Sequence, residues 1–269
     1  MNAHIVLAHP EPASFNGCMA KRALSHFHST GKTYSFNDLY ASAFDPVEHD
    51  RHYAARKNSE TFVPLDEQRQ AWKNGTTPDD VIAEINNLLN ADLVILQFPL
   101  WWHGPPAMLK GWFDRTFPSG GVYTSRMRYD EGYFKGRKAL LSVTTGAPEE
   151  AFGPGARGGD PKTMLWPLHY SLHYLGFEVL KPFWTYGVQG YGYSYEDQHS
   201  VERRLADALD DWEDRLLGLN EENGLNFSGW SDWDDAGRFP GSVVHERLTR
   251  SRRVGLEKCR PSYPSVFAV

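Results

Sequence analysis

One short run, residues 92–98, constrains the fold of this chain more than any other stretch. Its sequence, DLVILQF, is apolar at almost every position, whereas a strand with one face in water alternates apolar and polar residues. A continuously apolar strand is typical of a parallel sheet that helices cover on both faces. Helical patterns flank the run at 78–91 and 106–117, so the sequence predicts a sheet between two layers of helices.

The rest of the chain repeats this alternation. Further strands are expected at 4–9, 32–40, 138–145 and 177–186, and further helices at 14–31, 161–176 and 201–219. The polar stretch 45–77 predicts an irregular excursion over the surface, with weak helical tendency. Five strands favour the flavodoxin-like order 2-1-3-4-5 over a six-stranded dinucleotide fold, and no G-x-G-x-x-G fingerprint follows the first strand. We therefore expect an α/β fold with a doubly wound, five-stranded parallel sheet.

The predicted elements also suggest how the chain is divided. Residues 1–220 contain all the expected strands and helices, which predicts one flavodoxin-like domain. Residues 221–269 show no clear repeat, and 227–241 are rich in Gly, Asp and Trp. We expect this part to form an irregular C-terminal arm that packs on the same domain.

Composition excludes several classes of function. The 269 residues carry a net charge of -6, which gives no sign of a nucleic-acid partner. No apolar run approaches the roughly 18 residues that a membrane helix needs. Cys18 and Cys259 have neither metal-ligand spacing nor the density of a disulfide scaffold. We expect a cytoplasmic protein without a metal site, a nucleic-acid partner or membrane insertion.

Histidines on two predicted helices have simple explanations. His169 and His173 stand four residues apart, as zinc ligands can, but no H-E-x-x-H glutamate accompanies them. Their helix is largely apolar, so packing is the better interpretation. His26 and His28 are expected on the surface of the first helix.

Three loops are the best candidates for chemistry. In an open α/β sheet, ligands bind beyond the carboxyl ends of the strands, near the point where the strand order reverses. For the order 2-1-3-4-5, the loops after strands one, three and four meet there. Their sequences are HPEPASFN, PLWWHGPP and TTGAPEEAFGPGARGGD.

Each loop has a functional explanation and at least one simpler structural explanation. His9, Ser14 and Asn16 at a helix N-terminus suit a phosphate, or simply cap the helix. The aromatic residues of the second loop suit a ring-binding wall, a lid or a subunit interface. The third loop, with its threonines and glycines, suits backbone contacts to a polar ring edge, or is a flexible surface loop. Together, the three loops favour a flat ring system with a phosphate tail, such as a flavin.

At these loops the sequence resembles the NAD(P)H:quinone oxidoreductase family, the flavodoxin-like quinone reductases. The matching segments cover most of residues 4–190 in order. They are VLAHPEPASFN, ADLVILQFPLWWHGPPAMLKGWFDRTF, YDEGYFKGRKALLSVTTG and LWPLHYSLHYLGFEVL. The part that runs from QFPL to LKGWFDR is highly specific.

The resemblance implies a homodimer with a flavin at the dimer interface, FAD rather than FMN, and NAD(P)H as the hydride donor. It assigns cofactor contacts to residues of all three loops: His9, Ser14, Phe15 and Asn16 for the pyrophosphate, Pro99, Leu100, Trp101, Trp102 and His103 beside the ring, and Thr144, Thr145 and Gly146 at the pyrimidine edge. Asp114 matches an acidic residue on the cofactor side. Arg203 or Arg204 matches an arginine of the late helix.

One pair of positions departs from the family. Its best-known members carry a tyrosine and a histidine, six residues apart, that steady the charge building on the flavin. Alignment without gaps places Phe152 and Gly158 there. We hypothesise that Arg157 stabilises this charge instead, with His103 as the second choice and Phe152 beside the reacting ring. A solvated loop charge is the alternative explanation of Arg157.

The expected activity is FAD-dependent, two-electron oxidation of NAD(P)H with reduction of quinones or similar planar conjugated electrophiles, by ping-pong hydride transfer. Trp102, His103, Tyr123 and Phe152 are expected to wall a substrate pocket that selects for planarity. Two alternatives remain. One is a specialised pathway oxidoreductase with an altered substrate loop, and the other is a flavin-binding regulatory subunit of a membrane transport system.

Overall fold

The structure is a computed structural model, and it describes residues 1–188 and 197–239. The chain divides into two compact units, Met1–Ser228 and Gly229–Val269. Cys259 and the part of the predicted arm after residue 239 lie outside the described residues. That residues 221–269 form an arm packed on one domain therefore stays a prediction.

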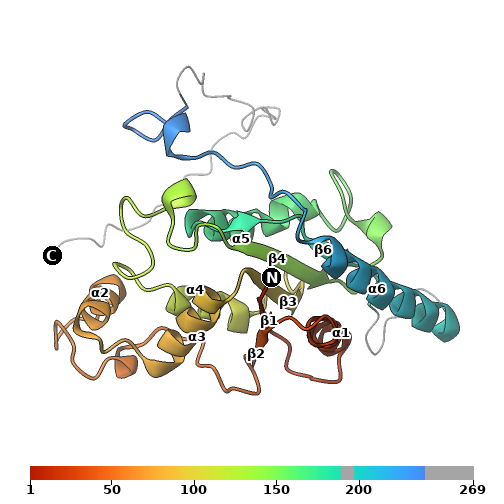
Figure 1. Ribbon diagram of the computed structural model, residues 1–269, viewed down its shortest axis with the longest axis horizontal. Coiled ribbons are helices and arrows are strands. Elements are labelled where there is room, and N and C mark those ends of the chain that lie inside the picture. Colours follow the sequence, from red (N-terminus) through yellow and green to blue (C-terminus); the bar gives the residue numbers. More distant parts are fainter. Residues whose placement is uncertain (189–196, 240–269) are drawn as a thin grey trace, which may run out of the picture. The chain divides into compact units, whose positions relative to one another are not determined.

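The first unit contains a parallel sheet with the strand order β2-β1-β3-β4-β5, which confirms the predicted order (Figure 1). Every pairing in it is parallel. The strands are β1 Ala3–Leu7, β2 Tyr34–Asp38, β3 Leu93–Pro99, β4 Lys138–Thr144, β5 Glu178–Val179 and β6 Phe183–Thr185. All seven residues of β3 are buried, as its apolar sequence requires.

The strand predicted at 177–186 is divided into two short pieces. β5 pairs with the start of β4, and β6 pairs with its end. Between them, the Leu180 amide still donates to the Ala139 carbonyl at 2.8 Å. Pro182 has no amide hydrogen to donate, so the ladder is interrupted at this edge.

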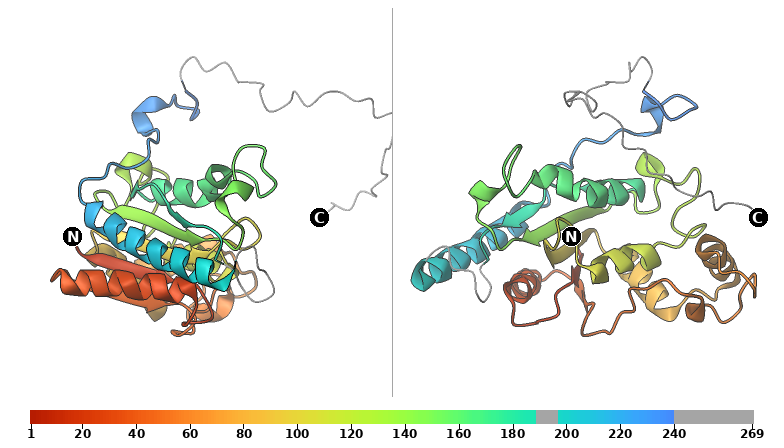
Figure 2. Two further views of the ribbon diagram at one scale, coloured as in Figure 1. Left: turned by 90° about the vertical axis from the view of Figure 1, so that its right-hand side faces the viewer. Right: turned by 180° about the vertical axis from the view of Figure 1, so that it is seen from behind.

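Helices cover both faces of the sheet. They are α1 Phe15–Ser29, α2 Pro64–Asn74, α3 Asp79–Asn90, α4 Ala107–Thr116, α5 Pro161–Tyr174 and α6 Gln198–Gly218. Helices α1 and α6 pack on one face, and α3, α4 and α5 pack on the other (Figure 2). Short 3-10 turns lie at Asp50–His52, Tyr129–Glu131, Glu149–Ala151 and Trp230–Asp232.

Two local predictions were incomplete. Helix α2 lies inside the stretch expected to be irregular, although it carries ordinary helix signals: Pro64 in its first turn, acidic residues after it and Gly75 at its end with φ of 68°. Helix α6 begins before residue 201 because Asp197 caps it, accepting a hydrogen bond from the Ser200 amide at 3.0 Å.

The core has one part on each face of the sheet. Trp112 of α4 belongs to the core on the face covered by α3, α4 and α5. Trp212 of α6 belongs to the core on the face covered by α1 and α6. Both side chains are fully buried. His26 is buried against Phe27 of α1, so its predicted surface position was wrong, whereas His28 is exposed as expected. Within the described residues, no helix is both long and apolar enough to cross a membrane.

One cluster of polar side chains has a buried centre, formed by His4 and Glu84. Glu84 of α3 lies 2.8 Å from the His4 ring nitrogen Nε2 and accepts a hydrogen bond from Trp112 Nε1 at 3.0 Å. Asn37 donates to the same carboxylate. The other ring nitrogen of His4 lies 2.8 Å from the Ser35 hydroxyl. These contacts tie β1 and β2 to the helices over them.

Candidate functional site

The first loop ends in the N-terminus of α1. The Ser14 hydroxyl caps the helix by accepting a hydrogen bond from the Gly17 amide at 3.2 Å. A Cβ at Gly17 would lie 2.1 Å from the Pro12 carbonyl oxygen, so only glycine lets the loop fold this closely over the helix. Within the described residues, the amides of Phe15 and Asn16 have no acceptor. This helix end can therefore bind an anion.

The Asn16 side chain joins the three loops at their base. Its amide donates to the Thr144 hydroxyl at 2.9 Å, and its oxygen accepts from Gln97 Nε2 at 2.9 Å. All three side chains are buried. The sequence predicts Asn16 as a cofactor contact, and the structure shows that its side chain fixes the ends of β3 and β4 to α1. Gln97 was missed, although it is the one amide side chain in an otherwise apolar strand.

The second loop is a tight turn in an unfavourable conformation. Trp101 and Gly104 exchange backbone hydrogen bonds of 2.9 and 3.0 Å, and the two residues between them have φ of 49° (Trp102) and 61° (His103). Such turns favour Asn or Gly, because positive φ costs other residues about 1 kcal/mol or more each. The turn holds the Trp102 side chain 98% exposed. Within the described residues, the amides of Trp102 and His103 lack acceptors.

The first two loops are in contact. The rings of His9 and Trp101 lie 5.9 Å apart, and His9 Nδ1 also lies 3.0 Å from the Glu11 amide. Pro99 is buried and pairs with Thr144, while the Leu100 amide donates to the Thr144 carbonyl at 2.8 Å. The predicted ring-side segment is thus anchored on β4.

The third loop begins in the core and turns outward. Thr144 and Thr145 are buried, and the Thr145 hydroxyl donates to the Ala147 carbonyl at 2.8 Å. Gly146 is exposed, and the amides of Gly146 and Ala147 have no acceptor in the described part of the chain. The buried hydroxyl of Thr185, on the neighbouring β6, is also without a partner there.

The two positions that depart from the family lie side by side. A Cβ at Gly158 would lie 2.7 Å from the Ala151 carbonyl oxygen and 3.1 Å from the Phe152 ring. The Gly158 amide donates to that carbonyl at 2.8 Å. A larger residue at 158 would displace the loop or Phe152. Arg157 is exposed, and within the described residues its guanidinium has no partner.

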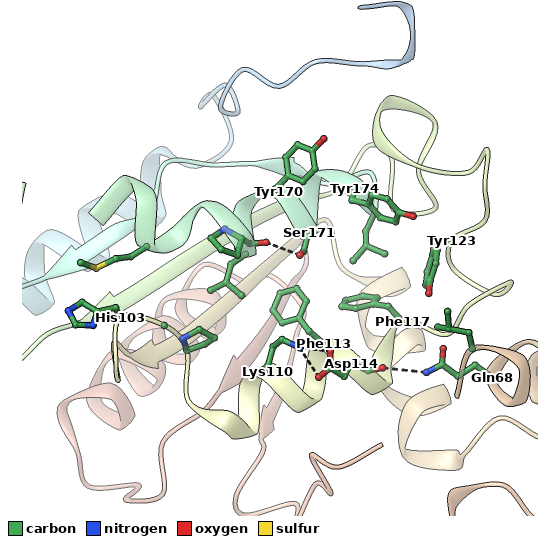
Figure 3. Close-up of a pocket in the computed structure, with 17 residues that line it drawn as sticks. Gln68, His103, Lys110, Phe113, Asp114, Phe117, Tyr123, Tyr170, Ser171 and Tyr174 are labelled. Atoms are coloured by element: carbon green, nitrogen blue, oxygen red, sulfur yellow. Dashed lines mark hydrogen bonds and ion pairs between the residues drawn. The ribbon is translucent and has the colours of Figure 1, made fainter. Parts of the chain in front are cut away.

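A cavity of about 520 Å³ lies between α4 and α5 (Figure 3). Phe113 of α4 and Phe117, the residue just after this helix, line it, with His103 toward one end and Tyr123 toward the other. Asp114 also lines it and forms an ion pair with Lys110 at 2.6 Å. The cavity therefore brings three predicted site residues, His103, Asp114 and Tyr123, to one apolar groove.

Two other predicted residues lie elsewhere. Phe152 contacts the Tyr186 ring at 5.5 Å, on the far side of the third loop. Arg204 donates to the carbonyls of Tyr186 and Gly187, both at 2.9 Å, whereas Arg203 is exposed. Arg204 is therefore the arginine of the late helix that faces the loops. Tyr186 could not be singled out from the sequence, because an aromatic residue at the end of an edge strand is common.

The chemistry of the edge follows from these parts. Amides at the start of α1, in the Trp102–His103 turn and at Gly146–Ala147 lack acceptors within the described residues, and all three groups lie at the carboxyl ends of neighbouring strands. Such a set fits a phosphate and the polar edge of a flat ring. Among the described residues, no three His, Cys, Asp or Glu side chains are grouped to hold a metal ion.

Comparisons with known proteins agree with this fold. The flavodoxin-like fold family matches residues 1–216. NAD(P)H dehydrogenase [quinone] 1 of Cavia porcellus is 38% identical over 234 residues, which cover 86% of this chain and 82% of the relative. Ribosyldihydronicotinamide dehydrogenase [quinone] of Mus musculus is 37% identical over 82% of this chain and 93% of its own.

A solved structure is similarly close. A Klebsiella pneumoniae protein assigned as a quinone reductase superposes with a TM-score of 0.79 and 31% identity, covering 95% of this chain and 98% of that one. The match extends over nearly the whole of both chains and confirms the resemblance noted from the loops. The chain therefore belongs to the NAD(P)H:quinone oxidoreductase family, a family of oxidoreductase enzymes with the flavodoxin-like fold.

Proposed function

We propose that this protein is a flavin-dependent NAD(P)H:quinone oxidoreductase that uses FAD and works by a ping-pong scheme. The observation that carries the proposal is the set of amides at one edge of the sheet that have no acceptor among the described residues, in a chain 38% identical to an NAD(P)H dehydrogenase [quinone]. A bound flavin would supply two-electron hydride chemistry between NAD(P)H and the acceptor. The residues of the chain bind, orient and shield it.

Each loop has a distinct task in this proposal. The α1 N-terminus, with Phe15 and Asn16 amides, binds the pyrophosphate. The turn at Trp102 and His103 forms a wall beside the ring and excludes water from its face. The Gly146 amide donates to the polar edge of the ring. FAD is favoured over FMN because the chain matches the longer relatives over most of their length.

The charge that builds on the ring needs a donor or a cation, since neither Phe152 nor Gly158 can supply one. We propose that Arg157 does so from the third loop, because its side chain is exposed and, within the described residues, without a partner. Arg157→Ala is then expected to slow flavin reduction by NAD(P)H roughly tenfold or more. Arg126→Ala, at another exposed loop arginine, is the matched control and should leave the rate unchanged.

We also propose that a second copy of the chain covers the groove between α4 and α5. The groove is lined mainly by apolar and aromatic side chains and holds His103 and Tyr123, so a partner there would complete the substrate pocket. Sedimentation equilibrium tests this proposal: a homodimer is expected, and a monomer at micromolar concentration would contradict it.

The cytoplasm is the proposed location.

Cofactor extraction and anaerobic stopped flow test the function. The purified protein is expected to be yellow, to release FAD on denaturation and to pass electrons from NADPH or NADH to simple quinones. Bleaching with NAD(P)H but no turnover with a quinone panel would favour a specialised pathway enzyme. Binding of flavin with negligible reduction would favour a regulatory subunit, and a colourless protein that takes up no flavin would refute the proposal.

A further inference from the structure

A second cavity, of about 740 Å³, lies between α5 and the edge strand β6. It is distinct from the groove between α4 and α5, because its walls come from the third loop, the edge strand and residues 225–227. Its volume lies within the range of about 300–1,000 Å³ that is usual for small-molecule sites. Phe152 is the predicted site residue that lines this cavity, whereas the amides proposed to bind the flavin are not among its lining residues.

Aromatic rings form two walls of the cavity. On one side, the rings of Trp184 and Tyr186 are stacked, with centroids 5.6 Å apart and planes at 11°. The centroid of the Phe152 ring lies 5.5 Å from that of Tyr186. On the other side, Trp166 of α5 packs 5.7 Å from Phe227. Rings in such walls bind flat aromatic molecules by stacking or edge contacts.

One polar side chain among these walls has an unmet hydrogen-bonding capacity. His169 of α5 lines the cavity and is only 6% exposed. Its Nε2 atom is fully enclosed, and within the described residues neither ring nitrogen makes a hydrogen bond. A buried polar group without a partner is unfavourable by about 1–3 kcal/mol, so it marks a place where a ligand atom can be bound. His173, one turn on, differs because its Nε2 meets the Ser228 carbonyl at 2.9 Å.

We propose that this cavity is a second binding site, for a flat aromatic molecule that carries a phenol hydroxyl or a ring carbonyl, and that His169 bonds that oxygen. The walls supply the stacking surface, and His169 supplies a directional contact from a buried polar side chain. Two lysines and two carboxylates at the lining, Lys162, Lys181, Glu149 and Asp160, balance each other in charge. This balance favours a ligand without net charge.

The imidazole suits either oxygen. Burial lowers the pKa of His169 to about 4, so the ring is neutral at neutral pH. A neutral imidazole has one donor and one acceptor nitrogen, and can accept from a phenol or donate to a carbonyl according to its tautomer. The proposal does not depend on the flavin, and its test needs no NAD(P)H.

Calorimetric titration of the full-length protein with 2-naphthol and with naphthalene tests the proposal. These probes share one ring system and differ only in the hydroxyl. The wild-type protein is expected to bind 2-naphthol about tenfold more tightly than naphthalene. In the His169→Leu variant, naphthalene should still bind, and the two probes should bind with about equal affinity.

Two further variants separate this result from a general loss of structure. Trp166→Ala removes a wall residue that is 53% exposed, so the fold should persist while both probes bind about fivefold more weakly. His26→Leu is the matched control, since His26 is also buried, and its Nε2 has no partner in the part of the chain that the structure describes, but it lies on α1. It should leave both affinities unchanged.

The outcomes are decisive in either direction. An unchanged preference for 2-naphthol in His169→Leu would overturn the proposal, as would naphthol binding that only a Trp102→Ala variant weakens, because that places the probe beside the flavin. No binding of either probe to the folded wild-type protein would mean that His169 is hydrated and the cavity holds only water. If His169→Leu fails to fold, the Trp166→Ala result and the shift of the His169 ring nitrogens on adding 2-naphthol, measured by NMR, decide the question.

Discussion

At Glu84, four neighbouring side chains surround one buried carboxylate. Besides His4, Trp112 and Asn37, the Asn87 amide donates to it at 3.3 Å. Burial alone would raise the pKa of Glu84, but the contact with His4 and the hydrogen bonds from Trp112 and Asn37 outweigh it and lower the pKa. The ionised carboxylate therefore stabilises the fold above the ordinary pKa, and this stabilisation is lost as the pH falls through the lowered value.

Replacing Glu84 is accordingly expected to be severe. Glu84→Ala leaves two buried side chains, His4 and Trp112, and the half-buried Asn37 without their acceptor, and should lower the free energy of unfolding by about 3–5 kcal/mol in urea denaturation at pH 7. Glu131→Ala is the control, because its ion pair with Lys135 is exposed and should contribute at most about 0.5 kcal/mol. Equal effects of the two substitutions would contradict the role assigned to the buried cluster.

His169 gives the opposite residue-scale test, because it is buried neutral. Its pKa is lowered from 6.5 to about 4, so below pH 6.5 the unfolded chain binds a proton that the folded chain does not. The contribution of the neutral His169 to stability is therefore fully present above pH 6.5 and is lost as the pH falls toward 4. Relative to His169→Leu, the wild-type protein should lose about 2 kcal/mol of unfolding free energy between pH 7 and pH 5. Parallel stability curves for the two proteins would refute this.

At the scale of elements, the turn between β3 and α4 combines strain with exposure. His103 has φ of 61° without being glycine, so His103→Gly should raise the free energy of unfolding by about 1 kcal/mol. The same change removes a proposed wall residue and should lower quinone turnover. Ala43→Gly is the control, since Ala43 has φ of 51° outside the site and should gain stability at unchanged turnover. Both effects are read from thermal melts and steady-state rates.

The elements also show what sequence patterns can predict. The parallel sheet followed from strands that alternate with helices, and the count of five expected strands favoured the order that the structure shows. The break at Pro182 was not predicted, because its effect depends on how this edge strand pairs across the sheet. The Asn16–Gln97–Thr144 cluster joins residues up to 128 positions apart, so no local pattern could reveal it. The unpartnered state of His169 likewise arises only from packing.

At the scale of the whole molecule, the first folded unit does not end with its last helix, α6, but continues to Ser228. Residues 219–228 follow α6 but complete the sheet edge: the Leu225 amide donates to the Val179 carbonyl at 2.7 Å, and Leu225 and Phe227 pack on the core. Lys138 Nζ also donates to the Glu222 carbonyl at 2.7 Å. A boundary at residue 220 would remove these contacts, whereas the compact unit extends to Ser228.

Two truncations test this boundary directly. A chain ending at Ser228 should fold and melt within about 2 °C of the full-length protein, because its core lies inside the unit. A chain ending at Asn220 loses two partly buried apolar side chains and the hydrogen bonds of the edge, at about 3 kcal/mol or more. For a unit of this size, that loss lowers the Tm by roughly 6–12 °C. Equal melting temperatures for the two truncations would show that residues 221–228 add nothing to the fold, and would favour the earlier boundary.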